Sequence, residues 1–119
     1  MLRADALRFQ WVQDDPANIA DTQAHPASYA LHQNHPNPFN PATVVSYQLP
    51  ATSDVKLVVY DLLGREVSVL VNERQTQGYY VVRFEGRALS SGVYLCRLMY
   101  VGRTPSEQGT VARKMVLVR

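Results

Sequence analysis

The sequence has one cysteine, Cys96, among its 119 residues, so no disulfide can form within the chain. No apolar run approaches the roughly 18 residues that a membrane-spanning helix needs. The N-terminus also lacks the basic and then apolar pattern of a signal peptide, so an exported protein of this sequence would carry its export signal elsewhere. The length allows one domain with a modest core and a tail, and the chain reads as a fragment of a longer protein.

The chain also has no large excess of charge of either sign, since its net charge is only +2. Residues 1–30 hold two arginines against four aspartates, whereas the remainder carries a net charge of +4. The basic residues are scattered singly, without the clustered face or interleaved aromatic side chains that nucleic-acid binding requires. This distribution favours a solvated β surface and argues against a nucleic-acid partner.

Few groups are available for catalysis or metal binding. His25, His32 and His35 precede the strand-forming part of the chain, and no carboxylate pair or nucleophile with a base can be assembled from the spacing. His32 and His35 lie in a proline-rich segment with no third ligand nearby, which favours a surface pair over a zinc site. Cys96 falls in the middle of a predicted strand, where a lone cysteine is most often a small buried hydrophobe. We therefore expect no enzyme activity, cofactor or metal.

The clearest pattern in the chain is a β-hairpin with arms at residues 55–60 and 65–71. Between the arms, the Asp61 side chain can accept hydrogen bonds from the following N–H groups, and Gly64 can take the positive φ that ends such a turn. A bulky residue should therefore cost more at Gly64 than at Leu62. The expected aliphatic face consists of Val55, Leu57, Val59, Val67, Val69 and Val71.

Further alternating stretches predict strands at residues 43–49, 78–84, 92–100 and 111–119, with the last strand running to the final residue and covered on both faces. Polar loops are expected at residues 72–77 and 102–110. The expected inward-facing residues are Val45, Tyr47, Leu49, Tyr80, Val82, Phe84, Tyr94, Cys96, Leu98 and Tyr100. About seven short strands with no helix between them predict an all-β, immunoglobulin-like antiparallel sandwich. The Tyr94-x-Cys96 pair is typical of a tyrosine corner, although a plain core tyrosine fits equally well.

The first part of the chain differs in character. Residues 2–12 fit a strand or a helix, and either the end of a preceding domain or a vector-derived segment would explain them. Residues 16–30 are poor in large aliphatic side chains and predict an extended, mobile linker. Residues 31–41 contain three prolines and should form a stiff, irregular lead-in with Phe39 docked on the core. We therefore divide the chain into residues 1–30 and a domain at 31–119.

Four segments together resemble the type A C-terminal sorting domain of the type IX (Por) secretion system. They are Leu31-x-Gln33-Asn34-x-Pro36-Asn37-Pro38-Phe39-Asn40-Pro41, Tyr60-Asp61-Leu62-Leu63-Gly64-Arg65-Glu66-Val67, Leu89-x-Ser91-Gly92-x-Tyr94 and Lys114-Met115-Val116-Leu117-Val118-Arg119. His35 stands where the family usually has an aromatic residue, Phe84 where a tryptophan is common, and the 102–110 loop looks longer than usual.

The resemblance implies an immunoglobulin-like domain, similar to part of flagellar hook-capping proteins, that ends a secreted or cell-surface cargo protein of a Gram-negative bacterium. It implies recognition by an outer-membrane translocon, and cleavage in the preceding linker by a sortase-like peptidase that can attach the cargo to an anionic lipopolysaccharide. The residues that match the family's sorting motifs are Asn37, Pro38, Phe39, Asn40, Pro41, Gly64, Gly92, Tyr94, Lys114 and Arg119.

For several of these residues a purely structural role stays open. The two glycines can serve backbone geometry, Tyr94 the core, and Lys114 a solvated strand surface. Replacing Lys114 by alanine and removing Arg119 should leave the melting temperature nearly unchanged yet block export.

An adhesive or carbohydrate-binding module is the alternative function, because Tyr29, Tyr79 and Tyr100 would form a sugar-binding surface if they were exposed. A weak homodimer through an exposed strand edge is a further expectation.

Overall fold

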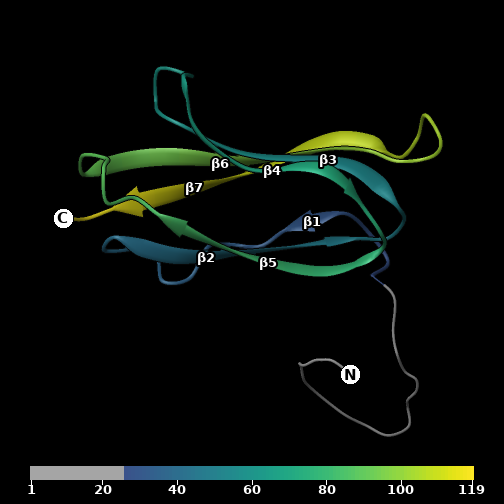
Figure 1. Cartoon of the computed structure of the whole chain (residues 1–119), viewed down its shortest axis with the longest axis horizontal. Coiled ribbons are helices and arrows are strands. Elements are labelled where there is room, and N and C mark those ends of the chain that lie inside the picture. The colour runs from purple at the N-terminus through teal and green to yellow at the C-terminus, as the bar shows by residue number, and fades with distance from the viewer. Residues whose placement is uncertain (1–25) are drawn as a thin grey trace, which may run out of the picture.

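The computed structural model describes residues 26–119, in which every regular element is a strand. The strands are β1 (Ala30–Leu31), β2 (Ala42–Leu49), β3 (Ser53–Tyr60), β4 (Glu66–Gln75), β5 (Gly78–Glu85), β6 (Gly92–Val101) and β7 (Gln108–Leu117). They form two stacked antiparallel sheets with strand orders β1-β2-β5 and β4-β3-β6-β7 (Figure 1). The predicted all-β sandwich is confirmed. The described residues also contain no helix that could cross a membrane.

The strand order is consistent with an immunoglobulin-like sandwich. β2 and β5 share one sheet, while β3, β6 and β7 share the other, as strands B and E and strands C, F and G do in immunoglobulin domains. β4 follows β3 through a hairpin and forms one edge of the larger sheet. The chain therefore crosses repeatedly between the sheets, and the inward side chains of both sheets build one core.

Alternate residues of the strands fill the space between the sheets. The predicted inward-facing residues of β2, β5 and β6 are confirmed as buried or half-buried members of this core. Leu31, Phe39, Met115 and Leu117 complete it from the lead-in and from β7. Full burial of each such side chain contributes about 1.5–3 kcal/mol to stability, so the side chains from the lead-in and β7 are a substantial part of the core.

The predicted hairpin is confirmed as β3 and β4, but its second arm differs from the expected pattern. Register shifts between Leu57 and Val58 and between Val59 and Tyr60 interrupt the pairing with β4. Each bulge reverses the alternation of side chains, so Val69 is 46% exposed and does not join Val67 and Val71 on one face.

β4 also continues further than predicted, through Asn72 to Gln75, where a polar loop was expected. Polar side chains are compatible with pairing there because β4 is an edge strand with a solvated side. The connection to β5 is correspondingly short, at residues 76–77.

The predicted last strand is wrong at both ends. β7 begins at Gln108, inside the loop expected at 102–110, and pairs with β6 from there. It ends at Leu117, so Val118 and Arg119 do not continue the strand. The N–H of Val118 instead donates to the carbonyl oxygen of Phe39 over 2.9 Å.

Residues 26–30, assigned above to the linker, contact the sandwich. Ala30 and Leu31 pair with β2 as the short strand β1. The Tyr29 ring stacks on Tyr100 with centroids 3.7 Å apart, and its hydroxyl lies 2.6 Å from Ser53 Oγ. A two-residue strand has no periodicity to read in the sequence. Residues 1–25 lie outside the described residues, as do the predictions for residues 2–12 and for most of the linker.

Candidate functional site

Four segments that are far apart in the sequence meet at one end of the sandwich, on the left of Figure 1. We call this the motif end: residues 37–41, 61–64, 86–92 and 114–119. The registers require this meeting, because β2 begins opposite Glu85, β3 ends opposite Leu95, and β6 begins opposite Leu117. Nine of the ten predicted sorting-motif residues belong to these segments, and the tenth, Tyr94, lies two residues after Gly92 on β6.

The lead-in, residues 31–41, hydrogen-bonds to the edge of β7. The N–H of Phe39 donates to the carbonyl oxygen of Val116 over 2.8 Å, and Phe39 and Leu117 form a parallel bridge. Asn37 Oδ1 accepts a hydrogen bond from the N–H of Val116 over 2.9 Å. The Phe39 ring is 1% exposed and meets Phe84 edge to face, with centroids 6.0 Å apart. The predicted docking of Phe39 is confirmed, while its neighbours Pro38 and Asn40 stay exposed.

Two residues that sequence reasoning missed hold the lead-in in place. Asn34 is buried, and its Nδ2 donates to Thr43 Oγ1 and to the carbonyl oxygen of Pro36. Gly86 donates its N–H to the carbonyl oxygen of Pro41, and a Cβ at Gly86 would lie 3.1 Å from Leu117 Cδ2. A glycine after a strand indicates only a turn, so its close approach to β7 has no sequence signal.

The hairpin turn is tied together by Asp61. Its Oδ1 accepts hydrogen bonds from the N–H groups of Leu63 and Arg65, each over 2.9 Å, and its Oδ2 lies 2.8 Å from Arg65 Nε. The N–H of Arg65, first among these donors, holds the pKa of Asp61 below its ordinary value of 3.8. Gly64 has φ +83°, as predicted. The turn presents Leu62 and Leu63 to solvent, 74% and 78% exposed.

Tyr94 is a core residue that also lines both depressions beside the hairpin turn. Its side chain is 6% exposed, and its hydroxyl donates to the carbonyl oxygen of Ser90 over 2.7 Å. This hydrogen bond is the one that defines a tyrosine corner, so Tyr94 forms a tyrosine corner and is not a plain core tyrosine. Gly92 precedes it at φ +156°.

The two cationic sorting residues differ in their surroundings. Arg119 Nη1 donates to the carbonyl oxygens of Arg87 and Leu89, and its N–H donates to Ser91 Oγ. Arg119 therefore closes the β5–β6 loop, and the expectation that its removal leaves stability unchanged does not fit this structure. Lys114 is exposed, and no carboxylate of residues 26–119 lies within 4 Å of its amine.

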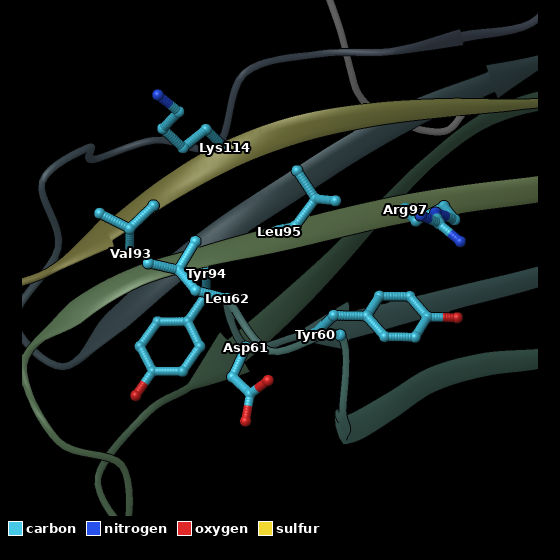
Figure 2. A pocket seen from close by; sticks show the side chains of 9 residues that line it. Tyr60, Asp61, Leu62, Val93, Tyr94, Leu95, Arg97 and Lys114 are labelled. Carbon is cyan, nitrogen blue, oxygen red and sulfur yellow. The ribbon is translucent and has the colours of Figure 1, made fainter.

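Two depressions flank the hairpin turn. One, of about 240 Å³, lies between the turn and the outer face of β6, and Figure 2 shows its lining side chains. The other, of about 460 Å³, lies between the turn and the β5–β6 loop. Residues 26–119 contain no group of three or more side chains suited to hold a metal ion.

Two other groups of candidate residues lie elsewhere. Tyr29 and Tyr100 are half-buried and stacked on each other, which leaves Tyr79, 64% exposed, as the one exposed ring of the proposed sugar-binding set. Burial raises the pKa of the Cys96 thiol to about 12, so it stays protonated in the core. This agrees with the interpretation of Cys96 as a small hydrophobe.

Comparison with known proteins identifies one family. The chain matches the secretion system C-terminal sorting domain over residues 34–117, which contain the second and third motifs in full and most of the first and last. Curated proteins and solved structures give no match. The chain therefore belongs to the secretion system C-terminal sorting domain family, which carries the type IX (Por) export signal of secreted and cell-surface proteins.

Proposed function

We propose that this domain directs a cargo protein through the type IX system across the outer membrane, without catalysis of its own, and that the motif end is the surface that the translocon contacts. The convergence of the four motifs carries this proposal. Core packing does not account for the exposed members Pro38, Asn40, Leu62, Leu63 and Lys114. Exposed apolar side chains on a turn held by Asp61 suit a docking surface.

The cargo joins the domain at the opposite end. β1 pairs with the last residues of β2, and Tyr29 contacts Ser53, where β3 begins. A peptidase needs a segment that can enter its groove as an extended strand. Since residues 29–31 are packed against the sandwich, we place cleavage by the sortase-like peptidase ahead of Pro26. The cargo is then released or attached to the cell surface.

Export of a fused reporter in a type IX-competent strain tests this proposal. Leu62→Ser with Leu63→Ser, and separately Lys114→Ala, should keep the melting temperature within a few degrees and block export, because none of these side chains belongs to the core. Val81→Ser is the matched control, as Val81 is 70% exposed on the other sheet and lies away from the motif end. Normal export of all the motif-end variants would contradict the assignment.

A further inference from the structure

The outer face of β6 is apolar where a solvated strand should be polar. Tyr94, Cys96 and Leu98 face the core, so Val93, Leu95, Arg97 and Met99 face outward, and all four are half-buried. An antiparallel sheet with one face in water usually alternates apolar and polar residues. Three of these four outward-facing residues are apolar although they do not belong to the core between the sheets.

A groove runs along this face beside the hairpin turn. We call it the outer groove; its main lining residues are Tyr60, Leu62, Val93, Leu95, Arg97 and Lys114 (Figure 2). Its volume of about 240 Å³ falls below the roughly 300 Å³ at which small-molecule sites begin, so it suits one inserted side chain.

The charges around the outer groove are predominantly positive. Arg97 lies over the Tyr60 ring, 4.9 Å from its centroid, and Lys114 pairs in register with Leu95. Within residues 26–119, no carboxylate lies within 4 Å of either cation. Asp61 also lines the groove, but its oxygens are engaged by Arg65 and by turn N–H groups. The groove therefore offers two cations that have no acidic partner among residues 26–119.

We propose that the outer groove binds an acidic segment of a protein of the translocation machinery, which inserts one apolar side chain beside Leu95 and places carboxylates on Lys114 and Arg97. A second copy of this chain is a poorer occupant, because face-to-face pairing would oppose like charges. This inference rests on the proposed function and adds the chemistry of the docking partner.

A zero-length cross-link tests the contact directly. The chain has two lysines, Lys56 and Lys114, and a water-soluble carbodiimide joins a lysine amine to a touching carboxylate as an amide. We would treat outer-membrane vesicles from a strain exporting the reporter fusion and map the products by mass spectrometry. The expected product links Lys114 to an Asp or Glu of an outer-membrane protein. It should disappear in Lys114→Arg, persist in Lys56→Arg, and fall about tenfold in Leu95→Ser, which corresponds to about 1.4 kcal/mol.

Charge reversal gives an independent readout. Lys114→Glu and Arg97→Glu should each slow export about tenfold or more, because each would oppose the partner's carboxylates. Arg103→Glu is the matched control, since Arg103 is an exposed cation in the β6–β7 loop at the far end. Equal melting temperatures would establish that the variants fold.

The outcomes separate the two proposals. If the wild-type domain fails to export the reporter, the proposed function itself is wrong. If the wild type exports, yet the reversals export normally and Lys114 gives no adduct, only the acidic partner is wrong. Adducts of Lys114 to aspartates in residues 1–25 would assign the groove to this chain's own segment and overturn the inference. Binding to phosphatidylglycerol vesicles with the same dependence on Leu95 and Lys114, and without a protein adduct, would overturn it in favour of a lipid.

Discussion

Tyr94 connects the core to the β5–β6 loop, and its hydroxyl can be tested apart from its ring. Tyr94→Phe keeps the buried ring but removes the hydrogen bond to the carbonyl oxygen of Ser90, and we expect a loss of about 1 kcal/mol in the free energy of unfolding. Tyr94→Ala also removes the ring and should cost about 3–5 kcal/mol. Urea denaturation measures both.

The matched control is Tyr79→Phe. Tyr79 is 64% exposed, and residues 26–119 offer its hydroxyl no hydrogen-bond partner, so the denaturation midpoint should not move. Equal midpoints for Tyr94→Phe and Tyr79→Phe would show that the tyrosine corner contributes nothing to stability.

Lys114 and Arg119 are similar in charge and close in sequence, but their surroundings in the structure differ. Both Lys114 and Arg119 lie in the last motif, and sequence reasoning treated them as one unit. Arg119 donates hydrogen bonds to four groups of the β5–β6 loop, namely the carbonyl oxygens of Gly86, Arg87 and Leu89 and the Ser91 hydroxyl. Lys114 has its amine in solvent beside the outer groove. Under the proposed function, export defects of Lys114 variants would therefore report on recognition alone, whereas those of Arg119 variants would also report on the loss of its hydrogen bonds to the loop.

At the scale of the element, the β3–β4 hairpin should weaken in acid. The pKa of Asp61 is lowered in the folded protein, chiefly by the N–H of Arg65. A lowered pKa contributes stability that is present above the ordinary value of 3.8 and is lost as the pH falls through the folded value. We expect Asp61→Asn to reduce the pH dependence of stability in this window. The measurement is the unfolding midpoint from pH 6 to pH 2, and equal slopes in both proteins would contradict the role of Asp61.

The sequence predicted those elements whose pattern is local. Successive side chains of β2, β5 and β6 alternate between more and less buried, and the large apolar residues at every second position predicted their inward faces. Asp61 with Gly64 specifies the turn within four residues. β4 was misread because its bulges depend on the register with β3, which no single strand encodes. β1 was missed because its two residues become a strand only through pairing with β2.

The sequence predicted which residues form the motif end, but not that these residues lie together in the folded domain. The sequence motifs indicated that residues 37–41 and 114–119 take part in sorting, but the contact between Phe39 and Val116 joins positions far apart in the chain. Only the closed sandwich brings them together. Gly86 and Asn34 were missed as contacts for the same reason, since their partners come from other segments.

The hydrogen bonds between the lead-in and the edge of β7 can also be tested. Asn37→Ala removes the side-chain oxygen that accepts from the N–H of Val116. We expect this amide to exchange with deuterium at least several times faster, with a loss of about 1 kcal/mol of stability. The Val118 amide bonds the main chain of Phe39 and serves as the internal comparison. Equal protection of Val116 in both proteins would mean that Asn37 does not hold the edge of β7.

For the whole molecule, the proposed function gives the two ends different tasks. Strands of about eight residues, at about 3.3 Å each, separate the motif end from the cargo end by about 25 Å. Under this proposal, a translocon that binds residues 61–64 would stay away from the cargo end, ahead of which the peptidase would cut. The same separation would let one small domain be bound by the translocon and cleaved from its cargo at the same time.

A matched pair of insertions tests this division. A short Gly/Ser stretch placed ahead of Pro26 should leave the melting temperature and reporter export unchanged, because only the cargo end is lengthened. The same stretch placed between Gly64 and Arg65 breaks the bond from the N–H of Arg65 to Asp61 and displaces Leu62 and Leu63. Longer turns cost little closure entropy, about 0.6 kcal/mol per doubling of length, so this variant should still fold while losing export. If both insertions export equally, the hairpin turn is not read by the machinery, and recognition would have to lie in the lead-in and β7 alone.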